Sequence, residues 1–458
     1  MNYLKNDTIT ALSTAVGKSA TAVIRLSGQN AFEIINKIFQ TNSSTDKQVK
    51  YGYIINGCEK VDEVICTFFK SPHTYTGEDL IEISVHGNPI IIDKVLNLLY
   101  KTGARPAEGG EFTYRAFLNG KKDLAEAEAV CNLITSATAA SAKAALNNIF
   151  GGFSSKIKTI KDNITNLIAF LEVNLDHPEE DIMFLSREEK LTRIDSHIQD
   201  VKNLLNSYKI SKILQNGINV AIIGKPNTGK SSLLNAILGR NRAIVTAIAG
   251  TTTDTIEETI ECKGIPFTII DTAGIRDHIN NSIELIGQER TKETITKADI
   301  LLWIFDSSSK LDKNDIKIAD YFKKSCTNIP IIAILNKSDL PANLYLTKNS
   351  FGITFQNIIH ISAKTETGIS DLLDKIVKIA GVSETQNNHL MINSRHYILL
   401  QNTLNALIKT KNVLKLKDAD EIACFEAINA QNYLNEILGI NIKQDILDAI
   451  FSNFCIGK

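Results

Sequence analysis

The feature of this sequence that most constrains its fold is the string Gly-Lys-Pro-Asn-Thr-Gly-Lys-Ser at residues 224–231. The string follows the apolar run 220–223 and precedes the helical pattern of residues 232–236, so it joins a predicted strand to a predicted helix. Its glycines let backbone N–H groups turn inward onto phosphate oxygens. We therefore predict a phosphate-binding loop, with Lys230 at the β- and γ-phosphates and Ser231 as a ligand of Mg²⁺.

Three further motifs, each directly after an apolar run, occur in the same part of the chain. They are Asp-Thr-Ala-Gly at 271–274, Asn-Lys-Ser-Asp at 336–339 and Ser-Ala-Lys at 362–364. Ligands of open α/β sheets bind at the carboxyl ends of the strands, where these motifs are expected to lie. Asp271 can hold the metal through water. The Asp339 carboxylate suits the two adjacent N–H donors of guanine, a pair that adenine lacks. Together the motifs predict a guanine-specific NTPase.

The sequence lacks the usual groups that promote GTP hydrolysis. Ile275 occupies the position where Ras-like proteins carry a glutamine that orients water, and no arginine finger is obvious. Asn227 offers a neutral oxygen beside the phosphates, which suits a monovalent cation that replaces the arginine charge. The alternative is that Asn227 only stabilises a turn. In the loop 250–254, Thr252 is the expected second magnesium hydroxyl.

Three kinds of sequence pattern follow one another along the 458 residues, a length that favours about three domains. Residues 8–118 mix β-type runs such as 21–26 and 80–85 with helical stretches, which indicates an α+β domain. Helical periodicity then continues to about residue 214 and resumes after about 382. Between these stretches, continuous apolar runs at 220–223, 267–270, 300–305, 331–335 and 358–361 indicate a buried, mostly parallel sheet.

These patterns predict a multidomain chain in which an α/β domain is inserted into a helical one. The predicted parts are an N-terminal α+β domain (1–119), a discontinuous α-helical domain (120–216 and 382–458) and an inserted Ras-like P-loop G domain (217–381).

Composition excludes several classes of protein. Apolar residues make up 43% and charged residues 22% of the sequence, as in globular domains. The sequence contains no run of eighteen apolar residues, so we expect no membrane-spanning helix. The seven cysteines never form a Cys-x-x-Cys pair, and the N-terminus lacks a secretory pattern, so we expect reduced thiols and a cytoplasmic location. With a net charge of −1, RNA binding requires a local basic patch or a second protein.

Short strings along the whole chain carry a resemblance to one family. They are Val-Ile-Arg-Leu-Ser-Gly (23–28), Tyr-Thr-Gly-Glu-Asp (75–79), His-Gly (86–87), Gly-Glu-Phe-Thr-Tyr-Arg-Ala-Phe-Leu-Asn (110–119), Asp-Leu-Ala-Glu-Ala-Glu-Ala (123–129), Pro-Glu-Glu-Asp (178–181) and Phe-Cys-Ile-Gly-Lys (454–458). The last string is the most specific. With these strings the chain resembles the tRNA modification GTPases called MnmE or TrmE.

The resemblance implies a function. Such proteins form homodimers and pair with an FAD-containing partner, MnmG, in a heterotetramer. Together they install a carboxymethylaminomethyl or aminomethyl group at C5 of the wobble uridine, position 34, of certain tRNAs. The carbon comes from a tetrahydrofolate derivative. Potassium and G-domain dimerisation stimulate the hydrolysis of GTP, which drives the conformational cycle.

The resemblance also implies ligands around GTP. The potassium ligands are Asn227, Thr246, Ile248 through its carbonyl, and Thr251, and the magnesium ligands are Ser231 and Thr252. The acid that orients water is Glu284, which one extra residue precedes here, and Thr253 stands where the family commonly has arginine. The residues assigned to GTP are Asn227, Thr228, Gly229, Lys230, Ser231, Ser232, Thr246, Ala247, Ile248, Ala249, Gly250, Thr251, Thr252, Asp271, Thr272, Ala273, Gly274, Asn336, Lys337, Ser338, Asp339, Ser362, Ala363 and Lys364.

A second site follows from the resemblance alone. The implied folate-binding residues are Arg25, Glu82, Lys121 and Lys458, and Cys455 is implied in catalysis of the modification. A carboxylate can accept paired N–H bonds from a pterin, and basic groups suit the glutamate tail of a folate. Without the resemblance, Arg25 and Glu82 read as an ordinary cross-strand pair, and Cys455 as a small buried side chain. For His86 we expect a structural hydrogen bond.

Two other functions fit the nucleotide motifs. A GTP-dependent switch in ribosome assembly uses the same motifs, but it would carry an RNA-binding module where this chain shows only helical patterns. A scaffold that recruits MnmG would need GTP for little more than stability. The N-terminal domain and the cysteine-bearing tail favour the modification enzyme.

Overall fold

The computed structural model describes two compact units. The described residues are 7–42, 47–176, 186–240, 257–271, 298–325, 329–381, 390–416, 420–452 and 454–457. One unit comprises Met1–Cys131, Asn148–Val201 and Ile398–Lys458, and the other comprises Asn132–Asn147 and Lys202–Tyr397.

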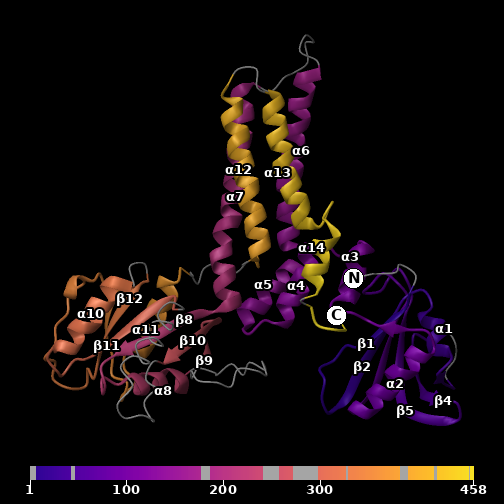
Figure 1. Cartoon of the computed structure of the whole chain (residues 1–458), viewed down its shortest axis with the longest axis horizontal. Coiled ribbons are helices and arrows are strands. Elements are labelled where there is room, and N and C mark those ends of the chain that lie inside the picture. Colours follow the sequence, from indigo (N-terminus) through magenta and orange to yellow (C-terminus); the bar gives the residue numbers. More distant parts are fainter. Residues whose placement is uncertain are drawn as a thin grey trace. The chain divides into compact units, whose positions relative to one another are not determined.

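The first unit contains a seven-stranded sheet with the order β3-β4-β5-β6-β2-β1-β7. Its neighbours pair antiparallel, except that β1 and β7 are parallel. Alternate side chains such as Ile24 of β2 and Ile83 of β6 are fully buried and pack with Val95 of α2, because a strand presents every second residue to the same face. The α+β prediction is confirmed (Figure 1). The elements are β1 (Ile9–Leu12), β2 (Ser19–Ser27), α1 (Ala31–Asn36), β3 (Phe39–Gln40), β4 (Val49–Asn56), β5 (Glu59–Phe69), β6 (Leu80–Gly87), α2 (Pro89–Lys101), β7 (Arg105–Pro106) and α3 (Glu111–Leu118).

Long helices follow, as predicted. The apolar stripe of α6, from Ile157 to Leu171, is buried, and α6 packs along α13. Ion pairs join α7 to its neighbours: Lys411 to Asp195, and Lys190 to Asp420 at 2.8 Å. The helices are α4 (Leu124–Ile134), α5 (Ala139–Ile149), α6 (Gly152–Asp176), α7 (Arg187–Asn216), α12 (Ser394–Leu414), α13 (Asp420–Leu438) and α14 (Gln444–Phe451).

The second unit contains a six-stranded sheet with the order β13-β12-β11-β8-β10-β9. The five predicted apolar runs form its parallel strands, and β9 is an antiparallel edge strand that was not predicted. Both faces are covered: Ile222 packs with Leu233 of α8, and Trp303 packs with Phe322 of α10. The α/β prediction is thus confirmed. The elements are β8 (Ile218–Gly224), α8 (Lys230–Arg240), β9 (Glu257–Cys262), β10 (Ile265–Asp271), β11 (Ile300–Asp306), α10 (Lys313–Ser325), β12 (Ile331–Asn336), η1 (Ser350–Gly352), β13 (Asn357–His360) and α11 (Ile369–Ile379).

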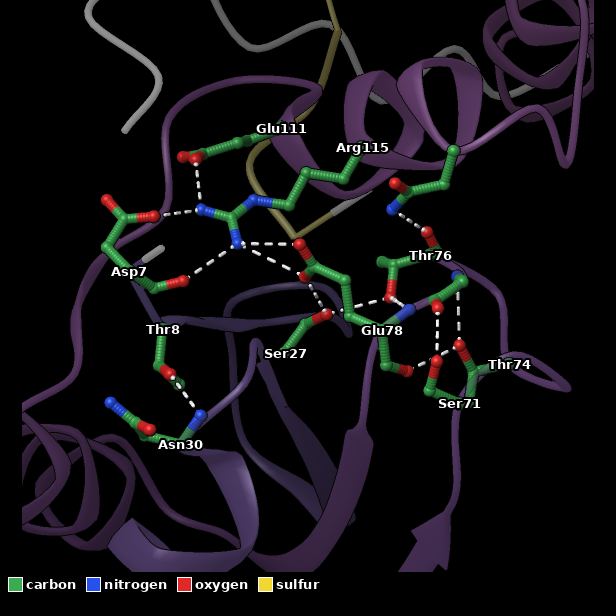
Figure 2. Close-up of polar contacts among 12 residues, drawn as sticks. Asp7, Thr8, Ser27, Asn30, Ser71, Thr74, Thr76, Glu78, Glu111 and Arg115 are labelled. Carbon is green, nitrogen blue, oxygen red and sulfur yellow. Dashed lines mark hydrogen bonds and ion pairs between the residues drawn. The ribbon is translucent and has the colours of Figure 1, made fainter. Parts of the chain in front are cut away.

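Two of the strings that carry the resemblance meet in a buried charge cluster (Figure 2). The Arg115 guanidinium donates to Asp7, to both carboxylate oxygens of Glu78 at 3.1 and 3.2 Å, and to Glu111 at 3.0 Å. Arg105, which is more exposed than Arg115, also forms ion pairs with Asp7 and Glu111. Burial opposes the charge of Arg115, but the surrounding carboxylates raise its pKa. The cluster fixes α3 against the start of β1 and the loop before β6.

Every helix in the described part of the chain is either too short or too polar to span a bilayer.

Candidate functional site

The predicted phosphate-binding loop joins β8 to α8, as the sequence indicates. Asn227 and Gly229 have left-handed backbone conformations, with φ of 63° and 95°. Thr228 is buried, and its hydroxyl donates to the Lys225 carbonyl at 2.8 Å. The Lys230 ammonium donates to the carbonyls of Gly224 at 2.9 Å and Lys225 at 2.7 Å. The loop is therefore held in its turn by contacts within itself.

Asn336 connects the phosphate loop to the predicted base pocket. Its side chain is buried at the end of β12, donates to the Thr228 carbonyl at 2.8 Å and accepts from the Ala363 N–H at 3.0 Å. The Asn336 amide passes so close to Gly229 that a Cβ at this glycine would lie 2.2 Å from Nδ2. Only glycine fits there, which explains its place in the motif.

Asp339 is exposed and accepts a hydrogen bond of 2.6 Å from the Ser362 hydroxyl. This bond is the main cause that lowers the pKa of Asp339, so the carboxylate is charged at neutral pH. The same bond fixes the orientation of the carboxylate. Lys337 pairs with Asp306 at the end of β11, and its φ is 64°. The structure thus brings the 336–339 and 362–364 motifs together, as predicted.

The remaining predicted residues of this site have a more limited description. Ser231 and Ser232 are exposed in the first turn of α8, Ser338 donates its N–H to the Ile361 carbonyl, and Lys364 is exposed. Asp271 ends β10, and its side chain is not described. The predicted residues outside the described ranges are Thr246, Ala247, Ile248, Ala249, Gly250, Thr251, Thr252, Thr272, Ala273, Gly274, Glu284 and Lys458.

The second predicted site lies on the sheet of the first unit. Arg25 and Glu82 are cross-strand partners in β2 and β6, and the Arg25 Nε donates to a Glu82 oxygen at 2.9 Å. Their side chains are 16% and 30% exposed, so the pair remains open to a ligand. The Arg25 guanidinium also lies over the Tyr75 ring, 5.4 Å from its centre. Lys121 is exposed in the turn after α3.

The C-terminal tail docks beside this pair. The Gly457 carbonyl accepts from Arg25 at 3.5 Å and from the Ser13 hydroxyl at 3.2 Å. Gly457 has φ of 90°, and a Cβ there would lie 2.1 Å from the Leu12 carbonyl. Sequence reasoning missed Ser13 and did not assign a role to Gly457. The need for glycine at 457 follows from its close approach to Leu12 and Ser13. A glycine in the sequence does not by itself indicate such contacts.

Cys455 is exposed within this docked tail. The Gly110 N–H, at the start of α3, donates to the Cys455 carbonyl at 3.2 Å, and Gly109 forms an antiparallel bridge with Ile456. The alternative that Cys455 is a buried apolar side chain is therefore wrong. Cys131 of α4 lies in the same region, where burial and, secondarily, Cys455 raise its pKa.

His86 makes the structural hydrogen bond that was predicted. The Nδ1 of His86 lies 2.7 Å from one carboxylate oxygen of Asp62, and the backbone N–H of His86 donates to the other oxygen at 2.9 Å. Asp62 raises the pKa of His86, chiefly through the side-chain hydrogen bond.

The sheet order and the joined motifs at the strand ends define a Ras-like P-loop GTPase. A family model described as "GTP-binding protein TrmE N-terminus" matches residues 8–121, and one described as "MnmE helical domain" matches residues 124–455. The "tRNA modification GTPase MnmE" of Endomicrobium trichonymphae is 70% identical and covers 100% of both chains. The protein of the same name from Aquifex aeolicus is 39% identical over 98% of this chain and 99% of its own length. The one from Thermotoga maritima is 40% identical over 99% of this chain and 100% of its own length. This chain belongs to the MnmE family of tRNA modification GTPases.

Proposed function

We propose that this GTPase acts with an FAD-containing MnmG-type protein on tRNA. The pair installs a carboxymethylaminomethyl or aminomethyl group at C5 of the wobble uridine, with a tetrahydrofolate derivative as carbon source. The observation that carries this proposal is the docked tail, which places the backbone around an exposed Cys455 next to the Arg25–Glu82 pair. Arg25 and Glu82 would bind the folate, with Lys121 and Lys458, and Cys455 would act in catalysis.

Mass analysis of position-34 nucleosides tests this function. In a strain without the gene, the wild-type chain should restore the modified uridine, and Cys455→Ser should not. The variant should hydrolyse GTP at the wild-type rate, since its thiol belongs to the other unit. Normal modification by Cys455→Ser makes the thiol structural, and normal modification by a hydrolysis-dead variant favours the scaffold function instead.

We propose further that the base pocket selects guanine through Asp339. Its charged carboxylate, held by Ser362, matches the two N–H donors of the guanine edge. Asp339→Asn should relax the preference toward xanthine nucleotides. An unchanged preference for GTP in competition binding contradicts this role.

Hydrolysis is proposed to depend on K⁺ and Mg²⁺. Asn227 is exposed in the loop with a left-handed backbone, and Ser231 lies exposed at the start of α8, so both oxygens are accessible to hard cations. Bound there, K⁺ would supply positive charge and Mg²⁺ would neutralise phosphate oxygens. Thr252 would complete the magnesium ligands, Thr246, Ile248 and Thr251 those of potassium, and Glu284 would orient water.

Comparison of the GTPase rate in KCl and in NaCl at equal ionic strength tests the potassium role. The rate should be much higher in potassium, and Asn227→Ala should remove most of the difference. Equal rates in the two salts refute the role.

We also propose a homodimer that works in the cytoplasm, where its tRNA and MnmG partners occur. Support for a contact between copies comes from a groove of about 330 Å³ beside α2, with Leu12 and Ile92 in its wall. Two of its lining residues are highly exposed, Val16 at 88% and Ile456 at 67%, and exposed apolar surface of this kind marks association sites. Val16→Asp should lower the molar mass found by light scattering, and an unchanged dimer places the contact elsewhere.

A further inference from the structure

An ion pair outside the predicted nucleotide site ties the phosphate loop to α10. The Lys225 ammonium lies 2.7 Å from a carboxylate oxygen of Asp315 and 3.0 Å from one of Asp312. The Lys225 side chain is 14% exposed and that of Asp315 is 1% exposed. Because so little water reaches Asp315, this lysine is the partner that offsets the cost of burying its carboxylate.

The two carboxylates are themselves fixed by the start of α10. Asp312 accepts the N–H groups of Asn314 at 2.8 Å and Asp315 at 3.3 Å, and the Asp312 N–H donates to Asp315 at 2.9 Å. This reciprocal arrangement is a helix cap that leaves neither carboxylate free to rotate. The cap therefore gives Lys225 a rigid anchor.

The backbone of Lys225 carries this anchor to the nucleotide site. Its carbonyl accepts hydrogen bonds from the Lys230 ammonium at 2.7 Å and from the Thr228 hydroxyl at 2.8 Å. A change in the direction of this carbonyl thus changes where the Lys230 ammonium lies. Lys230 is the residue that the loop motif directs to the β- and γ-phosphates.

We propose that Lys225 is a positioning residue for the nucleotide: its ion pair with the α10 cap holds the peptide that orients Lys230. Because the Lys225 ammonium is bound by Asp312 and Asp315, its proposed effect on the nucleotide passes through Lys230. The proposal goes beyond the proposed function, since it needs only the binding of a guanine nucleotide.

The test compares two nucleotides that differ in the β-phosphate. Lys225→Met should weaken GDP binding by about tenfold, equivalent to about 1.4 kcal/mol. GMP affinity should stay within about twofold, because GMP lacks the phosphate that Lys230 contacts. Fluorescent GDP and competition by GMP, on the full chain below its melting temperature, give both constants. Lys323→Met is the matched control, because Lys323 lies on α10 and pairs only with exposed Asp320 among the described contacts.

Two further variants decide the outcome if Lys225→Met fails to fold. Lys225→Arg should keep GDP affinity within about twofold, because a guanidinium can bind both carboxylates. Asp312→Asn removes the more exposed carboxylate, 51% exposed, and should weaken GDP binding by about two- to threefold with GMP unchanged. Wild-type GDP affinity in Lys225→Met or Asp312→Asn overturns the proposal, as does an equal loss for GDP and GMP.

Discussion

Two arginines of the first unit, Arg25 on β2 and Arg115 on α3, face carboxylates in opposite ways. Arg115 is 6% exposed and binds three carboxylates, among them Glu111, which is fully buried. Arg25 is 16% exposed and binds one, Glu82, which is 30% exposed. Both belong to strings that carry the family resemblance, so the sequence alone gives them equal weight.

The difference separates a structural cluster from a candidate binding site. Both terminal nitrogens of Arg115 donate to groups of the protein itself, as Figure 2 shows. Arg25 instead reaches one carboxylate, one backbone carbonyl and a ring, at a place that solvent reaches. Buried ionic groups that lose a partner cost several kcal/mol, whereas exposed pairs contribute about 0–1 kcal/mol.

The largest effect is expected at the buried cluster. Arg115→Met should lower the free energy of unfolding of the first unit by about 3–5 kcal/mol, because Glu78 loses its cationic partner and the buried Glu111 keeps only Arg105. Denaturant unfolding followed by circular dichroism measures the loss. Arg105→Met is the matched control and should cost less, since Arg105 is 32% exposed. A loss below about 1 kcal/mol for Arg115→Met would remove the distinction between the two arginines.

A smaller effect on stability, but a large one on binding, is expected at the open pair. Arg25→Met combined with Glu82→Gln should change the free energy of unfolding by about 1 kcal/mol or less. The same double variant should weaken the binding of a tetrahydrofolate derivative by about tenfold or more in calorimetry, as charge-assisted hydrogen bonds are lost. Wild-type folate affinity with reduced stability would instead group Arg25 with Arg115.

The smallest effect is expected at His86, an exposed partner of a buried carboxylate. Asp62 raises the pKa of His86, so the pair stabilises the fold fully below the unfolded value of about 6.5 and loses this contribution as pH rises through the folded pKa. His86→Gln should remove that dependence on pH. An NMR titration of His86 with a midpoint at or below about 6.5 contradicts the expectation.

The sequence predicted those parts of the fold in which neighbours along the chain determine the structure. Continuous apolar runs identified β11 and β12, because a strand buried on both faces has no polar alternation. The same rule missed β9, an edge strand whose buried Ile260 and Cys262 alternate with polar residues. The Gly-Lys-Pro-Asn-Thr-Gly-Lys-Ser string placed the phosphate loop correctly, since its function depends on local backbone geometry.

Contacts between distant residues were not predictable from such patterns. Lys225 and Asp312 are 87 positions apart, and no sequence pattern indicates that they form an ion pair. The docking of the tail depends on backbone atoms of Gly109, Gly110 and Gly457, which leave no trace in hydrophobic periodicity. The expected magnesium, potassium and water-orienting residues in 246–252 and at Glu284 lie outside the described residues and remain predictions.

The docked tail also has a consequence for biosynthesis. Ser13 and Gly457, which share a hydrogen bond, are separated by 444 positions. Because a ribosome delivers the chain from its amino end, Ser13, which directly follows β1, emerges long before its partner Gly457 is translated. A product that terminates after β13 but before Gly457 would therefore contain the whole GTPase sheet and yet lack the last contact beside Arg25.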